Sequence, residues 1–140
     1  AGFAAAVEAA SPERYAALPK IKEYLANELL TAIPGAAVIG PLPKDADSTA
    51  HILCISLPPV KAETMVHALC EQGVIVGTGS ACSSHQRKYS AALTEMGVPP
   101  RLMDSAIRIS LSAPNTLEEA QTAAGVIREQ YAVLSRFVKR

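Results

Sequence analysis

The spacing of apolar residues predicts a long helix toward each end of the chain. Two stretches carry an apolar residue every three or four positions, the period of a helix with one buried face. The first stripe comprises Tyr15, Leu18, Ile21, Leu25, Leu29 and Ala32, and the second Leu117, Ala120, Ala124, Ile127, Tyr131, Leu134 and Val138. Residues 11–13, Ser-Pro-Glu, supply an N-cap, a first-turn proline and an early acid. Thr116 and Glu119 form a capping box. Pro19 should kink or split the first helix, and alanine-rich 4–10 predicts another helix before it.

Shorter segments between these helices predict a small sheet with short connecting helices. Three apolar runs read as strands, the second of them buried: 37–39, 52–57 and 74–77. Three further segments read as short helices or helical turns: 62–72, 88–96 and 99–105. Gly73 and Gly97 end the first two of these. From residue 106 apolar and polar residues alternate, so Ile107 and Ile109 share one face of a strand and Arg108 lies on the other.

The order of these elements predicts an α+β fold. It favours a sheet of three or four strands with helices packed on one face. Residues 1–140 would form a single domain, which is long enough to bury a core. Arg108 would then point from the face that the helices leave bare. A salt bridge at the rim and an anionic ligand fit that position equally well.

Charge and cysteine content argue against several classes of protein. The formal net charge is zero, which argues against binding to nucleic acid or to an anionic membrane. No apolar run reaches the length of a membrane span. The three widely spaced cysteines argue against a disulfide framework and predict a reducing, cytoplasmic location.

Cys82 is the clearest candidate for chemistry. It lies in the segment 74–84, VIVGTGSACSS, which reads as a strand running into a glycine-rich loop. Loops on rigid scaffolds often carry catalytic residues, and the nearby cations Arg87 and Lys88 would favour a reactive thiolate. From the spacing alone, an ordinary small loop residue is equally open, because no base is visible in the motif.

Other residues suggest weaker alternatives. Cys54 lies within an apolar run and Cys70 on a helix, so both are expected to be structural. Three pairs have the spacing of potential metal ligands: His51 with Cys54, His67 with Cys70, and Cys82 with His85. Pairs fall short of the four ligands of a structural zinc site, so no metal site is assigned. His85 is too close in sequence to Cys82 for a protease base, and the GTGS segment lacks the lysine of a phosphate-binding loop.

Three segments together resemble a known family. They are the loop GTGSACSS, the MGV that follows a helix, and the strand SAIRISLS. At this interval they resemble the C-terminal part of the cysteine desulfurases, the NifS/IscS-like members of the class V aminotransferases. The stretch HILCISLPPVKAETMVHALCEQGVIV resembles the strand, helix and strand before that loop, and AGFAAAVEAA the helix leading out of the large domain. The resemblance implies the C-terminal small domain of a fold-type I pyridoxal phosphate-dependent transferase, with the large domain absent from this chain.

The resemblance also implies roles for individual residues. Cys82 matches the cysteine that takes sulfur from L-cysteine as a persulfide and leaves L-alanine, and Arg108 matches the arginine that binds the substrate carboxylate. Residues before Cys82 would support the loop: Gly77, Thr78, Gly79, Ser80 and Ala81. The sulfur would pass to an acceptor protein, either an iron–sulfur scaffold or a tRNA-thiolation enzyme, and the family forms homodimers.

The chain departs from the family at several points. None of its lysines lies in the family's Ser-x-His-Lys-type motif, so pyridoxal phosphate is expected only in the full-length enzyme, and the isolated chain is expected to be inactive. Cys54 stands where many relatives have asparagine, and His85 where they have a small residue. Two other hypotheses stay open here: a stand-alone sulfur-carrier or docking module without cofactor chemistry, and a small metal-binding module.

Overall fold

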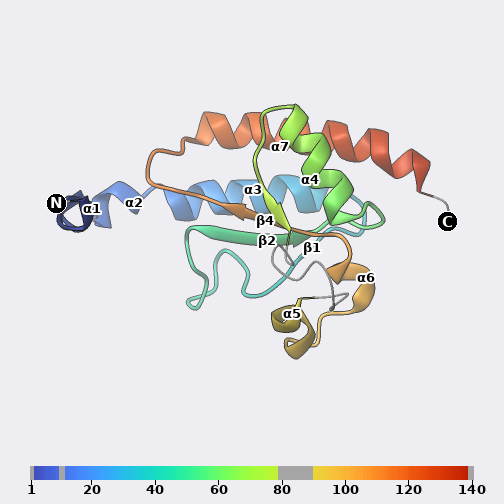
Figure 1. The fold of residues 1–140 in the computed structure, drawn as a ribbon, viewed down its shortest axis with the longest axis horizontal. Helices are drawn as coiled ribbons and strands as arrows, with labels where there is room; N and C mark the ends of the chain where they lie inside the picture. The colour runs from blue at the N-terminus through green and yellow to red at the C-terminus, as the bar shows by residue number, and fades with distance from the viewer. Residues whose placement is uncertain (1, 10–11, 79–89, 139–140) are drawn as a thin grey trace.

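A four-stranded antiparallel sheet forms the centre of the α+β fold (Figure 1). The computed structural model describes residues 2–9, 12–78 and 90–138. The strands are β1 (Ala37–Val38), β2 (Ile52–Ser56), β3 (Gly77–Thr78) and β4 (Ala106–Ser110), in the order β1-β2-β4-β3. The predicted fold class is therefore confirmed.

The long helices cover one face of this sheet. They are α3 (Leu18–Ala32), α4 (Ala62–Glu71) and α7 (Leu117–Leu134), all above the sheet in Figure 1. The short helices α5 (Ala91–Glu95) and α6 (Pro100–Met103) lie on its other side. At the N-terminal end α1 (Gly2–Ala9) and α2 (Pro12–Tyr15) precede α3, and the 3₁₀ turn η1 (Ser135–Phe137) follows α7. None of the described helices is both long and apolar enough to span a membrane.

The hydrophobic core fills the layer between the sheet and the long helices. Leu53 and Ile55 of β2, with Ile107 and Ile109 of β4, are buried in it. The helices contribute most of the remaining cluster, including Leu18, Leu25, Leu29, Met65, Leu69, Ala124 and Ile127. Burying a large aliphatic side chain contributes about 1.5–3 kcal/mol. This layer therefore holds the sheet rigidly and leaves its opposite face for other contacts.

The ends of the helices follow the signals in the sequence. Gly73 has a φ of +78°, and the amide of Val74 donates to the carbonyl of Leu69 over 2.9 Å, so α4 ends in the predicted glycine cap. The capping box of Thr116 and Glu119 is present at the start of α7.

The predicted split of the first stripe is confirmed, since α2 and α3 are separate helices. Pro19 lies in the first turn of α3, where a proline is tolerated. Other helix predictions change in detail. The N-cap Ser11 lies outside the described residues, as do the first two residues of the helix predicted over 88–96. Val138 is not part of the final helix, which ends at Leu134 and tightens into η1.

The third strand differs from the predicted 74–77. Among the described residues, Gly77 and Thr78 pair with β4 and residues 74–76 do not. The amide of Val74 is already bonded to α4, and the segment 74–76 diverges from the end of β4. A cavity of about 640 Å³ opens there, lined by this segment, by Ile109 to Leu111 and by the start of α7.

The strand β2 is buried on one face only. Its apolar run predicts a buried strand, but Cys54 is half-buried and Ile52 is exposed. The reason is that the long helices cover one side of the sheet, and alternate residues of β2 point to the other. Near α6 that other side is closed by Ser56, which is buried and donates from Oγ to the carbonyl of Leu102 over 2.7 Å.

Candidate active site

Arg108 lies at the middle of the bare face of the sheet. Its side chain is exposed, whereas its neighbours Ile107 and Ile109 in β4 are buried. The predicted alternation is therefore confirmed. Across the ladder Arg108 pairs with Cys54 of β2 on one side and with Gly77 of β3 on the other. Because directly paired residues share a face of the sheet, all three lie on the side away from the core.

Cys54 and Arg108 meet at a close point of the β2–β4 ladder. The amide of Leu111 donates to the carbonyl of His51 over 2.8 Å, so these two residues form a hydrogen-bonded pair. Hydrogen-bonded and non-hydrogen-bonded pairs alternate along antiparallel strands. Cys54 is three residues beyond His51, so its pair with Arg108 is of the non-hydrogen-bonded type, in which side chains lie closer together.

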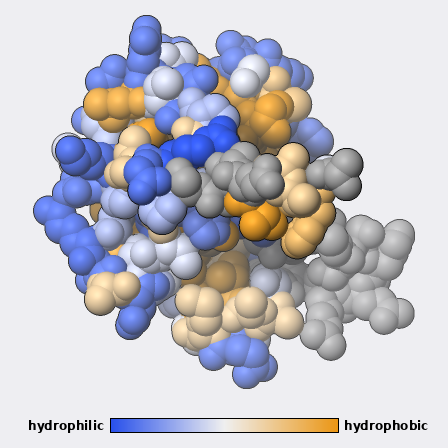
Figure 2. All heavy atoms as spheres, turned by 90° about the vertical axis from the view of Figure 1, so that its left-hand side faces the viewer, coloured by the Kyte–Doolittle hydropathy of each residue, from blue (hydrophilic) through white to orange (hydrophobic). Residues whose placement is uncertain are grey.

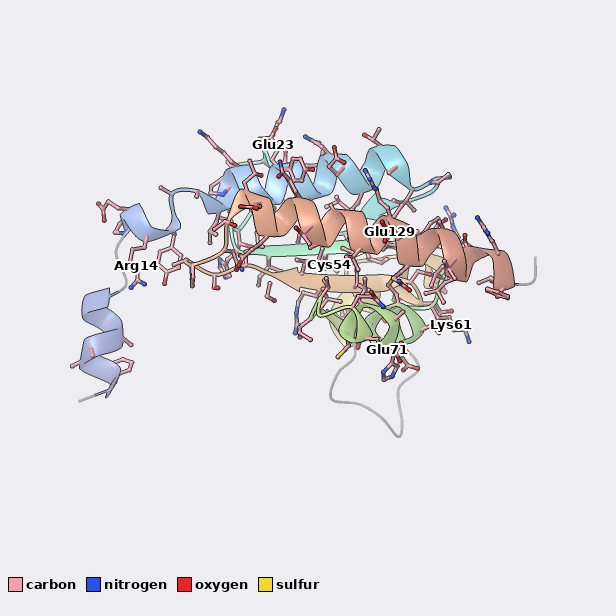
Figure 3. The ribbon with its side chains drawn as sticks, turned by 90° about the horizontal axis from the view of Figure 1, so that it is seen from above. Arg14, Glu23, Cys54, Lys61, Glu71 and Glu129 are labelled. Atoms are coloured by element: carbon pink, nitrogen blue, oxygen red, sulfur yellow. The ribbon has the colours of Figure 1, made fainter. Side chains whose placement is uncertain are left out.

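Cys54 has the character of a structural thiol. Burial raises the pKa of the Cys54 thiol, and the charge of Arg108 opposes this rise. The net effect is a raised pKa, so the thiol stays protonated at neutral pH and is a poor nucleophile. Viewed from above, Cys54 lies at the centre of the sheet, while the labelled charged residues surround it on helices and other segments (Figure 3). These properties fit the structural role expected from the sequence.

The guanidinium of Arg108 lies over β3. A Cβ atom added to Gly77 would be 3.4 Å from Nη2 and 3.9 Å from both Cζ and Nε of Arg108. Among the described residues, Arg108 forms neither a hydrogen bond nor an ion pair. A guanidinium fork without such a partner can bind a carboxylate through two parallel hydrogen bonds.

The chain as a whole has no excess of positive charge, because its formal net charge is zero. Figure 2 shows the end of the molecule that lies on the left in Figure 1, where hydrophilic and hydrophobic residues are interspersed. Recognition by Arg108 would therefore depend on its local geometry rather than on a broad positive field.

Most of the predicted loop lies outside the described residues. This holds for the candidate nucleophile, its preceding residues and the nearby histidine: Gly79, Ser80, Ala81, Cys82 and His85. Gly77, predicted as the end of a strand and as support for the loop, lies in β3, and Thr78, predicted as a loop residue, is paired in the same strand. The chain therefore leaves the strand beside Arg108 and reaches Cys82 four residues after Thr78.

The described residues contain no candidate metal centre. His67 and Cys70 are exposed on α4, and His51 directly precedes β2. In the described ranges, no group of three or more histidine, cysteine, aspartate or glutamate side chains is placed to hold a metal ion. The pair of Cys82 and His85 lies outside those ranges.

Comparison with known protein families identifies the family of this chain. The family model described as aminotransferase class-V matches residues 2–122. The chain belongs to the class V aminotransferases.

Within the class V aminotransferases, the chain is similar to several NifS-like proteins and cysteine desulfurases. The chain is 37% identical over 122 residues to a NifS/IcsS protein homolog of Lactobacillus delbrueckii subsp. bulgaricus, covering 87% of this chain and 30% of the relative. It is 30% identical to a cysteine desulfurase of Cereibacter sphaeroides, covering 97% of this chain and 35% of the relative. A solved NifS-like protein matches with a TM-score of 0.72 at 30% identity, over 87% of this chain and 29% of that one. The chain thus spans about a third of the length of these curated relatives.

The described part of this class V chain does not fit pyridoxal phosphate, the cofactor that the resemblance implies. Such a site needs a lysine for the cofactor and donors for its phosphate. Lys22 lines a cavity of about 200 Å³ that also touches Cys54, but its Nζ donates to Ser48 Oγ over 2.6 Å and to the carbonyl of Thr49 over 2.8 Å. Burial lowers the pKa of this ammonium. Lys22 thus ties α3 to the 48–49 segment, and no described residue is assigned to the cofactor.

Two features of the site were missed by reasoning from the sequence. Lys22 carried a signal, since it lies four residues after Leu18 and three before Leu25 on the buried stripe of α3. The contact between Gly77 and Arg108 carried none, because it depends on how two strands far apart in the sequence are paired.

Proposed function

We propose that this chain is the small C-terminal domain of a pyridoxal phosphate-dependent cysteine desulfurase, whose complete form converts L-cysteine to L-alanine. Membership of the class V aminotransferases and the relatives named as cysteine desulfurases support this assignment. The observation that carries the site is the position of Arg108. Its guanidinium has no internal partner among the described residues and lies over β3, the strand that leads to Cys82.

In this proposal Arg108 and Cys82 have separate roles in the reaction. Arg108 binds the carboxylate of L-cysteine in bidentate fashion and so orients the substrate. Cys82 accepts the sulfur: the Cβ–S bond of L-cysteine breaks, an S–S bond forms on Cys82, and the thiol hydrogen ends on Cβ of alanine. The atoms balance without a further reactant. The cofactor would be bound by the rest of the enzyme, since the described residues do not fit it.

The persulfide on Cys82 would then serve as a sulfur donor. We propose an acceptor protein in the cytoplasm, either an iron–sulfur scaffold or a tRNA-thiolation enzyme, and a homodimeric enzyme. These partners follow from the family resemblance.

The experiment that tests this function compares single cysteine variants of the enzyme that contains this chain. After a turnover with L-cysteine, peptide mass spectrometry should find an added sulfur atom on Cys82 in the wild type and in Cys70→Ala, whose exposed thiol on α4 is the control. Cys82→Ala should bind the cofactor as well as the wild type but release no transferable sulfur. Undiminished sulfur transfer by Cys82→Ala would show that another residue accepts the sulfur.

A further inference from the structure

We infer that Gly77 is a positioning residue for Arg108: the missing side chain at Gly77 leaves the space into which the guanidinium folds. The inference rests on the proposed function, because it assumes that Arg108 binds the substrate carboxylate. It assigns Gly77 a role different from the loop support expected from the sequence.

The first step of the argument is the contact itself. Gly77 and Arg108 are directly paired in the β3–β4 ladder. The three nearest atoms given for an added Cβ all belong to the Arg108 guanidinium, namely Nη2, Cζ and Nε. The charged end of Arg108 therefore lies across the backbone of β3, and the side chain does not simply extend away from the sheet.

The second step is that the backbone does not explain this glycine. Four described glycines have positive φ angles, a conformation that favours glycine: Gly35, Gly40, Gly73 and Gly97. Gly77 is not among them, and it sits in an ordinary antiparallel strand. Glycine also occurs where another group approaches the backbone closely, and here that group is the guanidinium.

The third step concerns the opposite side of Arg108. Cys54 of β2 faces Arg108 there, at a non-hydrogen-bonded pair where side chains approach closely, and its thiol is half-buried. One neighbour thus presents a side chain beside Arg108, while the other, a glycine, presents none. Arg108 is biased toward the β3 edge of the sheet before any substrate arrives. A preoriented side chain loses less conformational entropy on binding, so this bias strengthens carboxylate recognition.

The geometry predicts a graded response to side chains at Gly77. The Cβ of alanine would touch Nη2 at 3.4 Å, an ordinary contact. Valine adds two methyl groups beyond that Cβ, and these would occupy the place of the guanidinium. Alanine should therefore be tolerated, whereas valine should turn Arg108 away from β3.

The test measures kcat and KM for L-cysteine in the enzyme that contains this chain. Gly77→Ala should stay within about twofold of the wild-type KM, while Gly77→Val should raise KM about tenfold or more and leave kcat much less affected. The double variant Gly77→Val/Arg108→Ala should be no worse than Arg108→Ala alone, because both changes remove one interaction. Gly125→Val is the matched control, since a Cβ added at Gly125 meets nothing within 4 Å. Gly77→Thr offers the same branched shape if the valine variant does not fold.

The outcomes separate this inference from the proposed function. If Arg108→Ala leaves KM unchanged, the carboxylate role of Arg108 is wrong and the inference falls with it. If Arg108→Ala raises KM but Gly77→Val does not, only the inference is overturned. Additive effects in the double variant would also overturn it, because they would show that Gly77 acts on stability or folding rather than through Arg108.

Discussion

Replacing Arg108 by alanine should selectively weaken the binding of L-cysteine to the desulfurase that contains this chain. The guanidinium is exposed and has no hydrogen-bond or ion-pair partner among the described residues. Its removal therefore breaks no side-chain hydrogen bond or ion pair in that part of the chain. The loss should fall on the substrate carboxylate, which Arg108 is proposed to hold through two parallel hydrogen bonds.

The size of the effect follows from the type of bond. Hydrogen bonds to charged groups contribute about 1.5–3 kcal/mol each. At about 1.4 kcal/mol per factor of ten, the loss of one such bond should raise KM about 10- to 150-fold, and the loss of both should raise it further. Arg108→Lys keeps the charge but loses the planar fork, so its KM should lie between those of the wild type and the alanine variant.

Steady-state alanine production at varied L-cysteine concentration measures this effect. Arg136→Ala, which removes another exposed arginine in η1, is the control and should leave KM unchanged. Thermal unfolding of each variant checks that the fold is intact. A change in KM below about twofold for Arg108→Ala would refute the reasoning, since the carboxylate would then be bound elsewhere.

Other predictions concern the chain itself. Burial holds the pKa of Lys22 below 10.5, so the unfolded state binds more protons just below that pH, and the free energy of unfolding should rise toward pH 10.5. Denaturant titrations should show a weaker rise in Lys22→Met, and equal slopes would contradict the argument. Tyr131→Phe removes a 2.8 Å hydrogen bond to the carbonyl of Pro58 and should lower the free energy of unfolding by about 1 kcal/mol, as measured by chemical denaturation. Alkylation followed by mass spectrometry should label the exposed Cys70 faster than Cys54, and the reverse order would contradict the burial of Cys54. The isolated chain mixed with pyridoxal phosphate should show no absorbance of a bound cofactor, whereas a stable yellow adduct would place a cofactor site within it.

Helix caps and the alternation of apolar residues could be predicted from short stretches of the sequence. The capping box at Thr116 and the glycine at Gly73 mark helix ends where the structure has them. The alternation around Arg108 predicted which of its neighbours are buried. In each case a few adjacent residues determine the outcome, because caps and strand faces depend on backbone geometry within one or two turns or pleats.

Features that depend on tertiary contacts could not be predicted in this way. The apolar run 74–77 resembles a strand, but pairing with β4 begins only at Gly77, because the chain first completes the cap of α4. Cys54 looked fully buried from its neighbours, yet the helices cover only one face of β2. The fold of Arg108 over Gly77 requires the strand order and the register, neither of which a single sequence displays.

The register of β3 makes the length of the segment before it important. Gly73 anchors the end of α4, and three residues then lead to Gly77. Side chains alternate between the two faces of a strand, so one inserted or deleted residue in 74–76 would turn position 77 toward the core and bring a neighbouring side chain under the guanidinium. Substitutions of the exposed Ile75 should be tolerated, whereas a change in the length of the segment should not.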